Sequence, residues 1–328
     1  MRDIADHVGV SRQLVSLVLR GVTGPSAESR DRILAAASEL GYRPHASARL
    51  LRQNRTRLIG MVFQMRNPFQ VRFVERLFVR AAEKGLGLAL GAATVERPTD
   101  VVVAELMEER VEALVVFNPD PGSAALAEAC DLVPVVWLGE WVQKPEVDNV
   151  HVDEVEGLRL AIEHLVGLGH RDIVYVGGLG GSVGRDRADA YRAAMMTFGL
   201  SDQIEVLPSG FSEEDGAAAA REMAARAGRP TAVVCCGDQC AAGVMAVFAQ
   251  SRVQVPEDVS VIGFDDSYLS SLSYHRLTSV RQDVDATVEA TLSSVLERIE
   301  GGDGPRRVIA TATTLVVRDS TGPARTGA

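Results

Sequence analysis

The chain has 328 residues, of which 46% are hydrophobic and 24% are charged, with a formal net charge of −10. No apolar run reaches about 18 residues, which excludes a membrane-spanning helix, and the length suggests two or three domains. The N-terminus is polar and lacks the apolar core of a signal peptide, so we expect a cytoplasmic protein. The four cysteines have neither disulfide nor zinc spacing, so we expect no metal and no cofactor.

Charge is distributed unevenly along the chain. Residues 1–57 contain ten arginines and five acidic residues, a formal charge of +5, whereas the remaining residues carry −15. A small basic segment followed by a large acidic one indicates that only the first meets a polyanion. The alternative is that the charges are simply solvated surface.

Residues 1–41 contain three short helical patterns. The first ends at Gly9, the second begins at Ser11 as its N-cap, and the third runs from about Ser26 to Leu40, with Gly41 as the residue that stops it. The expected buried positions are Ile4, Ala5, Val8, Val15, Val18, Leu19, Ile33, Leu34, Ala37 and Leu40. Two short helices around a glycine turn, closed by a third, are typical of a helix-turn-helix.

An arginine-rich stretch over residues 42–57 separates these helices from the first apolar strand. With this stretch, the sequence resembles the lactose-repressor (LacI/GalR) family of transcription regulators. The residues that carry the resemblance are Asp3-Ile4-Ala5, Gly9-Val10-Ser11, Val15-Ser16, Arg32-Ile33-Leu34-Ala35-Ala36-Ala37, Leu40-Gly41-Tyr42-Arg43-Pro44 and Thr56-Arg57-Leu58-Ile59-Gly60. The similarity extends to about Ser320.

The resemblance implies a DNA-binding repressor whose operator affinity is set by a small-molecule effector. It implies an all-α helix-turn-helix domain (1–43), a hinge helix (44–57) and an α/β effector-binding and dimerisation domain (58–320), with a disordered tail (321–328). The last domain would resemble periplasmic sugar-binding proteins, with an N-lobe (about 58–153 and 284–311) and a C-lobe (about 154–283 and 312–320). Because no leucine heptad ends the chain, we expect a homodimer on a pseudo-palindromic operator.

In that family the second helix lies in the major groove. The corresponding candidates here are Ser11, Arg12, Gln13, Ser16, Leu17 and Arg20. Arginine and glutamine read guanine and adenine edges, whereas serine and a helix N-terminus suit phosphates. Leu17 stands where many members carry arginine, and it either contacts a thymine methyl group or packs within the helical bundle.

The hinge of the family folds when two subunits meet on DNA. The candidates here are Ala48, Arg49, Leu51 and Arg52, with Leu51 at the position of the leucine that parts a base step in the minor groove. An ordinary linker helix is the alternative. Only Met1 and Arg2 precede Asp3, so either the first helix is poorly capped or the true start lies upstream of Met1.

From Leu58 onward, short apolar runs alternate with helical patterns. The expected strands are residues 58–63, 86–91, 113–117, 133–138, 172–176, 232–236 and 259–264. The expected helices are residues 71–84, 99–110, 155–168, 187–198, 213–227, 241–250 and 285–300. This alternation predicts parallel sheets with helices on both faces, and the resemblance implies crossovers between lobes near residues 153, 284 and 312.

Ligands of open α/β folds lie beyond the carboxyl ends of the strands. The candidates for effector binding are Asn67, Phe69, Glu140, Arg187, Phe211, Asp238 and Asp265. The resemblance gives this role to Arg187, Phe211 and Asp265. Because a guanidinium and a carboxylate suit vicinal hydroxyls and an aromatic face suits a sugar ring, we expect a sugar or sugar derivative.

Several neighbouring residues have other interpretations. Gly237 stands where the family often has asparagine, so one polar contact is lost. Asp266 is expected to be a turn or cap residue, while Asp153 and Gln282 are expected to hold the lobe arrangement. For the two tryptophans, at 137 and 141, ligand contact and core packing both stay open.

An enzyme and a transport-linked binding protein are the two alternative functions. An enzyme is disfavoured because the glycine-rich run at 177–181 has Val183 where a dinucleotide-binding motif needs its last glycine, and no P-loop lysine follows. A transport-linked binding protein would have the same two lobes. The missing signal peptide and the basic N-terminal segment favour the regulator.

Overall fold

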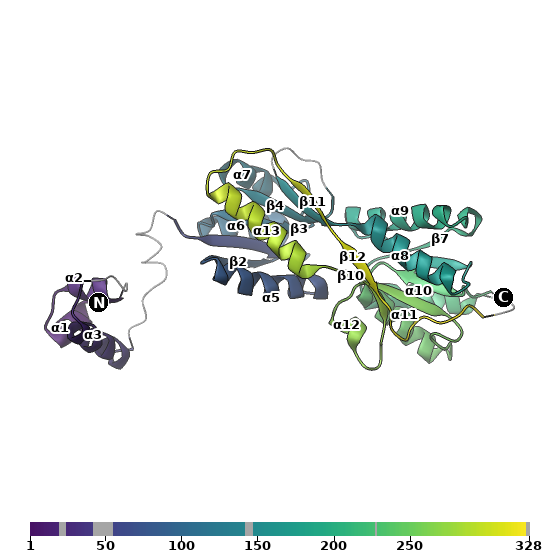
Figure 1. Cartoon of the computed structure of the whole chain (residues 1–328), viewed down its shortest axis with the longest axis horizontal. Coiled ribbons are helices and arrows are strands. Elements are labelled where there is room, and N and C mark those ends of the chain that lie inside the picture. The colour runs from purple at the N-terminus through teal and green to yellow at the C-terminus, as the bar shows by residue number, and fades with distance from the viewer. Residues whose placement is uncertain (20–23, 42–54, 142–146, 227, 326–328) are drawn as a thin grey trace. The chain divides into compact units, whose positions relative to one another are not determined.

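The computed structural model describes residues 1–19, 24–41, 55–141, 147–226 and 228–325. The chain divides into two compact units, Met1–Thr56 and Arg57–Ala328 (Figure 1). The regular elements of the first unit, within its described residues, are helices, and the second unit contains two sheets with helices around them.

The first unit consists of helices α1 (Arg2–Val8), α2 (Arg12–Leu19) and α3 (Ala27–Glu39). α1 has no side-chain cap, whereas Ser11 and Ser26 cap α2 and α3 by accepting hydrogen bonds from Leu14 N (3.1 Å) and Ser29 N (3.2 Å). The core comprises Ile4, Ala5, Val15, Val18, Ile33, Ala36 and Ala37.

The prediction that Leu34 and Leu40 are buried in the helical core is wrong. Leu34 and Leu40 are 46% and 45% exposed, and Ala36 is buried in their place. Ile33, Ala36 and Ala37 follow the i, i+3, i+4 spacing of one helix face, whereas Leu34 lies about 100° away from Ile33 and Leu40 is the residue that ends the helix.

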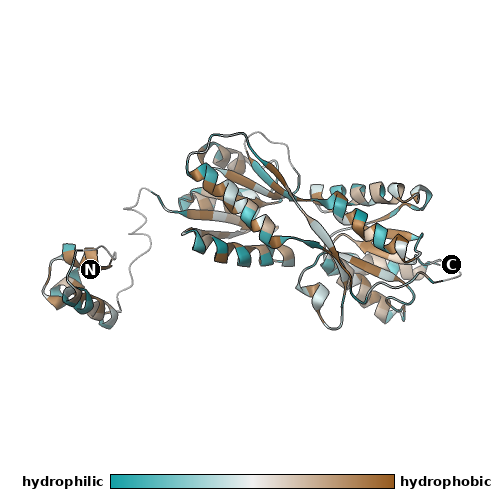
Figure 2. Ribbon diagram, viewed as in Figure 1, coloured by the Kyte–Doolittle hydropathy of each residue, from teal (hydrophilic) through white to brown (hydrophobic). Residues whose placement is uncertain are grey.

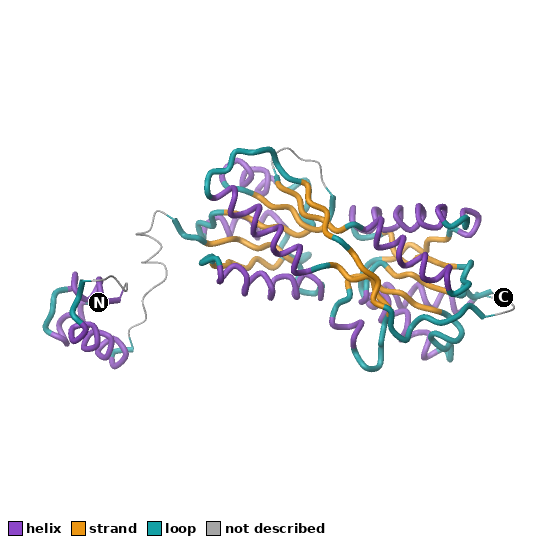
Figure 3. Tube along the Cα trace, in the orientation of Figure 1, coloured by secondary structure: helices purple, strands orange, loops and turns teal. Residues whose placement is uncertain are grey.

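The second unit contains two six-stranded sheets (Figures 1 and 3). The first sheet, in the order β11-β5-β4-β3-β1-β2, comprises β1 (Leu58–Phe63), β2 (Gly87–Ala92), β3 (Ala113–Phe117), β4 (Val135–Gly139), β5 (Asp148–Val152) and β11 (Val308–Thr311). The second, in the order β12-β10-β9-β8-β6-β7, comprises β6 (Ile173–Gly178), β7 (Glu205–Ser209), β8 (Ala232–Cys235), β9 (Ser260–Asp265), β10 (Thr278–Gln282) and β12 (Thr313–Val316). The pairing is parallel throughout except between β10 and β12.

Helices cover both faces of each sheet, and each sheet with its helices forms one lobe. The first lobe has α5 (Pro68–Glu83) and α13 (Val284–Ile299) on one face and α6 (Thr99–Glu108) and α7 (Ala124–Leu132) on the other. The second lobe has α8 (Glu154–Gly167), α9 (Gly181–Thr197), α10 (Glu213–Ala225), α11 (Asp238–Gln250), the short α12 (Tyr268–Ser271) and a 3-10 turn at Ser201–Gln203.

The strands are apolar on both faces because both faces are covered. In β1, Ile59, Met61 and Phe63 pack toward α5 and α13, while Val62 packs toward α6 and α7. Figure 2 accordingly shows hydrophobic strands at the centre of each lobe and hydrophilic residues on the outer surface of the helices. The parallel α/β architecture expected from the sequence is confirmed.

Several elements escaped the sequence patterns. β5, β7, β10, β11 and β12 were not expected, nor were α7 and α12. The missed strands contain polar residues, as in β10 (Thr278–Gln282). These residues interrupt the continuous apolar run by which a buried strand is recognised. α9 begins at Gly181, not at residue 187, because its glycine-rich start has no apolar periodicity.

The chain crosses between the lobes at three places, between β5 and α8, between β10 and α13, and between β11 and β12 (Figure 1). The first two crossovers each end in an aspartate that caps the next helix. Asp153 accepts a hydrogen bond from Glu156 N (2.9 Å), and Asp283 accepts one from Ala286 N (2.9 Å). Both crossovers are short because the capping residue starts the helix at once.

The tail expected to be disordered from Thr321 is packed as far as Arg325. Ala324 N donates to Leu168 O (2.9 Å), and the Arg325 guanidinium donates to Arg229 O (2.8 Å). The expectation is therefore wrong for these residues, because main-chain and arginine hydrogen bonds fix a segment that has little apolar content.

Candidate functional site

A cavity of about 520 Å³ lies between the two lobes, at the carboxyl ends of strands from both sheets. The first lobe contributes amides, aromatic rings and one carboxylate, including Asn67, Phe69, Gln70, Asn118, Glu140 and Trp141. The second lobe contributes charged side chains, a hydroxyl and a ring, including Glu154, Ser182, Arg185, Arg187, Phe211 and Asp265. Such a mixture suits a small polar molecule with an apolar face.

Arg187 is the central cation of this cavity. It is only 5% exposed, and its guanidinium carbon lies 3.7 Å from the ring centroid of Phe264 and 5.9 Å from that of Phe211. Nη1 donates to Cys236 O (2.5 Å), and Nη2 lies 3.4 Å from Asp265 Oδ1. Nε is buried and has no hydrogen-bond partner among the described residues, so it can donate to an added acceptor.

Asp265 ends β9 in the left-handed backbone region, with a φ of 101°. Its Oδ1 accepts a hydrogen bond from Gln282 Nε2 (2.6 Å). Burial raises the pKa of Asp265, and the nearby Arg187 partly offsets that effect. The rare backbone conformation turns the carboxylate into the cavity, where it can accept hydrogen bonds from a ligand.

Glu154 is a second carboxylate of this wall that the sequence analysis did not single out. It begins α8, directly after the first crossover, and is 9% exposed. Burial raises its pKa from 4.5 to about 7, although Arg187 acts in the opposite direction. No strand-end pattern identifies it, because its place in the cavity follows from the crossover.

Three candidates from the first lobe reach the cavity. Glu140 is buried and accepts a hydrogen bond from Trp137 Nε1 (2.9 Å). Asn67 caps α5 by accepting from Gln70 N (3.1 Å), and the Phe69 ring stands edge-on to Phe117 at 6.2 Å. The caps and rings hold these side chains in place before any ligand arrives.

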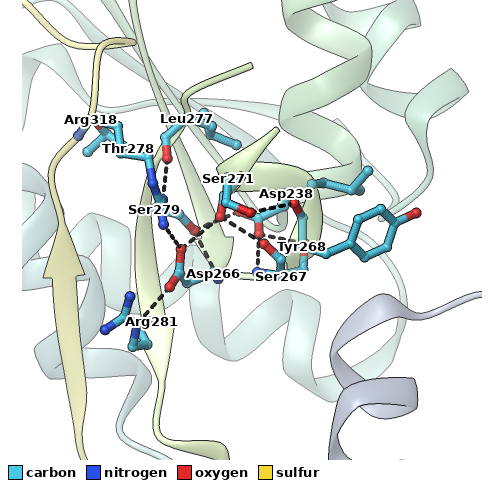
Figure 4. A network of polar contacts seen from close by, with 12 residues as sticks. Asp238, Asp266, Ser267, Tyr268, Ser271, Leu277, Thr278, Ser279, Arg281 and Arg318 are labelled. Carbon is cyan, nitrogen blue, oxygen red and sulfur yellow. Dashed lines mark hydrogen bonds and ion pairs between the residues drawn. The ribbon is translucent and has the colours of Figure 1, made fainter. Parts of the chain in front are cut away.

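Asp238 does not line the cavity, which corrects the sequence analysis. It is 1% exposed, is absent from the cavity lining and belongs to the buried polar network drawn in Figure 4. Oδ2 accepts hydrogen bonds from Ser267 N (2.6 Å) and Ser267 Oγ (2.8 Å), and Oδ1 accepts one from Ser279 Oγ (2.6 Å). Burial, with Asp265 nearby, raises its pKa to about 8.

Gln282 and Trp141 line the cavity, whereas Asp266 and Trp137 do not. Asp266 belongs to the same network and accepts hydrogen bonds from Arg281 (2.6 Å) and Arg318 (2.7 Å), so it does not face the cavity (Figure 4). Gln282, expected only to hold the lobes, lines the cavity, and Trp141 lines it at 53% exposure. Trp137 is fully buried in the core.

In the helical unit, the candidate surface is the start of α2. Arg12 and Gln13 are exposed beside Ser11, while Ser16 and Leu17 are half-buried. Leu14 packs on the helical core, whereas Leu17 is not part of that cluster in the described residues. The remaining candidates lie outside the described residues; they are Arg20, Ala48, Arg49, Leu51 and Arg52.

The described ranges contain no group of three His, Cys, Asp or Glu side chains placed as metal ligands would be. None of the helices in those ranges combines the length and apolar character needed to cross a bilayer.

Known proteins resemble the chain along nearly its whole length. Residues 1–45 match the family model of bacterial regulatory proteins of the lacI family, and residues 162–321 match the periplasmic binding protein-like domain. The lactose operon repressor of Escherichia coli (strain K12) is 30% identical over 308 residues, covering 91% of this chain and 84% of that protein.

Two solved structures have the same fold. The crystal structure of the Lac repressor dimer bound to operator and the anti-inducer ONPF aligns with a TM-score of 0.84 and 28% identity, covering 98% of each chain. The complex of the transcriptional regulator CelR with cellobiose aligns with a TM-score of 0.71 and 27% identity, covering 97% of this chain and 98% of that one.

Proposed function

The chain belongs to the lacI family of bacterial regulatory proteins, and on that premise we propose that it is a transcription repressor that binds a pseudo-palindromic operator as a homodimer. A small polar effector, a sugar or sugar derivative, controls its DNA affinity. The cavity carries this proposal because its lining side chains come from both lobes. A ligand that touches both lobes stabilises one lobe arrangement over another, and its binding energy can thereby shift a DNA-binding equilibrium.

Arg187 and Asp265 would hold hydroxyl groups of the effector, since Arg187 Nε lacks an acceptor and the Asp265 carboxylate lies beside it. The Phe211 ring would pack on an apolar face of a sugar. From the first lobe, Asn67, Phe69 and Glu140 would complete the contact. The name of the CelR–cellobiose complex supports the sugar assignment.

For DNA, we assign base reading to Arg12 and Gln13, which are exposed at the start of α2. Ser11 and Ser16 would contact phosphates, and Leu17 would meet a thymine methyl group. The assignments of Arg20, Ala48, Arg49, Leu51 and Arg52 rest on the sequence alone.

We assign the cavity to ligand binding and not to catalysis. Among its described lining residues, Ser182 is the one hydroxyl side chain and there is no histidine to activate it. A repressor of this kind would act in the cytoplasm, where it meets its operator.

The test is binding of the full chain to duplex fragments of its own genome over a range of salt concentrations. We expect tight binding to a few fragments, and an affinity that falls linearly with salt on a logarithmic scale. A protein starting at residue 58 should lose DNA binding and keep ligand binding, since the second unit is compact by itself. Absence of any duplex binding at low salt contradicts the proposal, and ligand binding by the full chain without an effect on DNA favours a plain binding protein.

A further inference from the structure

The N-terminus of α9 opens into the cavity. Gly180, the N-cap, has a φ of 88° and supplies no side-chain cap, and the first turn contains no acidic residue. Gly180, Gly181 and Ser182 all line the cavity, and apart from the adjoining main chain no described atom lies within 4 Å of where a Cβ of Gly181 would stand. The main chain is therefore open to a ligand at the end of a long helix, where N–H groups and the helix dipole favour negative charge.

Cationic side chains gather on the same wall. Arg185 and Arg187 both line the cavity, and both come from the first two turns of α9. Arg185 is exposed and forms no hydrogen bond or ion pair within the described ranges. The lining from the first lobe contains no lysine or arginine among its described residues. The cationic side chains among the described lining residues thus all lie on one wall of the cavity.

Arg187 Nε, which has no hydrogen-bond partner among the described residues, indicates independently of the α9 N-terminus that a ligand acceptor binds here. This side chain is 5% exposed, and its other two nitrogens already meet Cys236 O and Asp265. A donor buried in this way is normally satisfied by protein, water or ligand. An anionic oxygen at the start of α9 would be the strongest acceptor for it.

The carboxylates that line the cavity offset Arg187 but not Arg185. Asp265 and Glu154 both face Arg187, and Glu140 is held in the other lobe by Trp137. None of them is paired with Arg185, and none caps α9. Asp186, the neighbour of Arg185, interacts with it electrostatically but is not part of the cavity lining.

We propose that the start of α9, with Ser182, Arg185 and Arg187, is a subsite for an anionic group of the effector, a phosphate ester or a carboxylate. The effector is then a phosphorylated or acidic sugar derivative, not a neutral sugar. This inference rests on the proposed function and names the class of its ligand. The amides and rings of the first lobe receive the uncharged part of the molecule.

The test compares matched compounds on the full chain: ribose with ribose 5-phosphate, glucose with glucose 6-phosphate and with glucuronate, and inorganic phosphate alone. We expect one anionic member to raise the melting temperature at a concentration where its neutral parent does not. Inorganic phosphate should compete with it. Phosphate ester and carboxylate are told apart by which glucose derivative binds more tightly.

Two variants examine the subsite itself. Arg185→Gln and Ser182→Ala should each weaken the anionic ligand, with a loss of about ten-fold or more for Arg185→Gln. Arg192→Gln is the matched control, because Arg192 lies on the same helix, pairs with Asp189 and does not line the cavity. It should leave the affinity unchanged.

The outcomes separate this inference from the proposed function. If a neutral sugar binds as tightly as its anionic derivative, or if Arg185→Gln has no more effect than Arg192→Gln, the anion subsite is wrong and the repressor assignment stands. If none of these compounds, neutral or anionic, binds the full chain, the sugar effector and the anion subsite are both overturned.

Discussion

Asp265 and Asp266 are consecutive residues whose carboxylates lie in different environments. Asp265 lines the cavity beside Arg187 and Gln282. Asp266 does not line it and binds Arg281 and Arg318 instead, as Figure 4 shows. Both have positive φ angles, 101° and 46°. The main-chain O of Asp266 also accepts a hydrogen bond from Arg72 of the first lobe (3.2 Å). This dipeptide therefore connects the cavity wall to a structural network and to the other lobe.

Asp265→Asn should weaken the effector by about 10- to 100-fold, because it removes the charge that strengthens hydrogen bonds to the ligand. Its melting temperature should fall only modestly, because asparagine can still accept from Gln282 although Arg187 loses its charged partner. Calorimetric titration measures the affinity. Asp238→Asn is the control. Because the Asp238 carboxylate lies outside the cavity, this variant should bind the effector as tightly as the parent does. A loss of affinity equal to that of Asp265→Asn would show that Asp238 belongs to the binding site.

Asp266→Ala should lower the free energy of unfolding by about 3 kcal/mol, because it leaves Arg318 without its buried partner. Asp285→Ala, which breaks an exposed pair with Arg76, should change it little. Urea denaturation of the three proteins gives the comparison. Equal stability of both variants would contradict a structural role for the network.

The Asp266 network also predicts an acid dependence. Burial acts to raise the pKa of Asp266, but hydrogen bonds from Ser270, Arg281 and Arg318 outweigh it and hold the pKa below its ordinary value of 3.8. The stabilisation is thus fully present above the unfolded pKa and is lost as the pH falls through the folded one. The difference in free energy of unfolding between the parent and Asp266→Ala should therefore shrink below about pH 4. A difference that stays constant down to lower pH would contradict this prediction.

Glu154→Gln should stabilise the protein at alkaline pH. Burial raises the pKa of Glu154 from 4.5 to about 7, so the folded state holds a proton that the unfolded state has released. Parental stability then falls as the pH rises from 4.5 to 7, by roughly 3 kcal/mol relative to the glutamine variant. Denaturation curves at pH 5 and pH 8 measure this. Glu163→Gln, at an exposed position of the same helix, should give no such difference.

Arg12→Ala should reduce operator affinity by about 1–3 kcal/mol and relax the preference at particular base pairs, because arginine reads guanine through two hydrogen bonds. Binding of operator variants, each with one base pair changed, measures this preference. A uniform loss on all sequences, together with a shallower salt dependence, would make Arg12 a phosphate contact.

Sequence patterns alone predicted the architecture of both units. The alternation of apolar runs and helical stretches from Leu58 onward predicted parallel sheets covered on both faces, and three helical patterns predicted the N-terminal unit. These inferences succeed because period and polarity are local properties of the chain. The rule that ligands lie beyond strand ends also picked residues that line the cavity, among them Asn67, Arg187, Phe211 and Asp265.

The tertiary structure decided which way those side chains point. Asp238 and Asp265 both follow or end central strands, yet only Asp265 faces the cavity, because its φ of 101° turns the carboxylate inward while Asp238 opens α11 and is enclosed by Ser267 and Ser279. Glu154 and Gln282 reach the cavity because the chain crosses between lobes beside them. The sequence pattern determines which residues lie at the end of a strand. The backbone dihedral angles at those ends and the contacts between the two lobes depend on the packing of residues far apart in the chain.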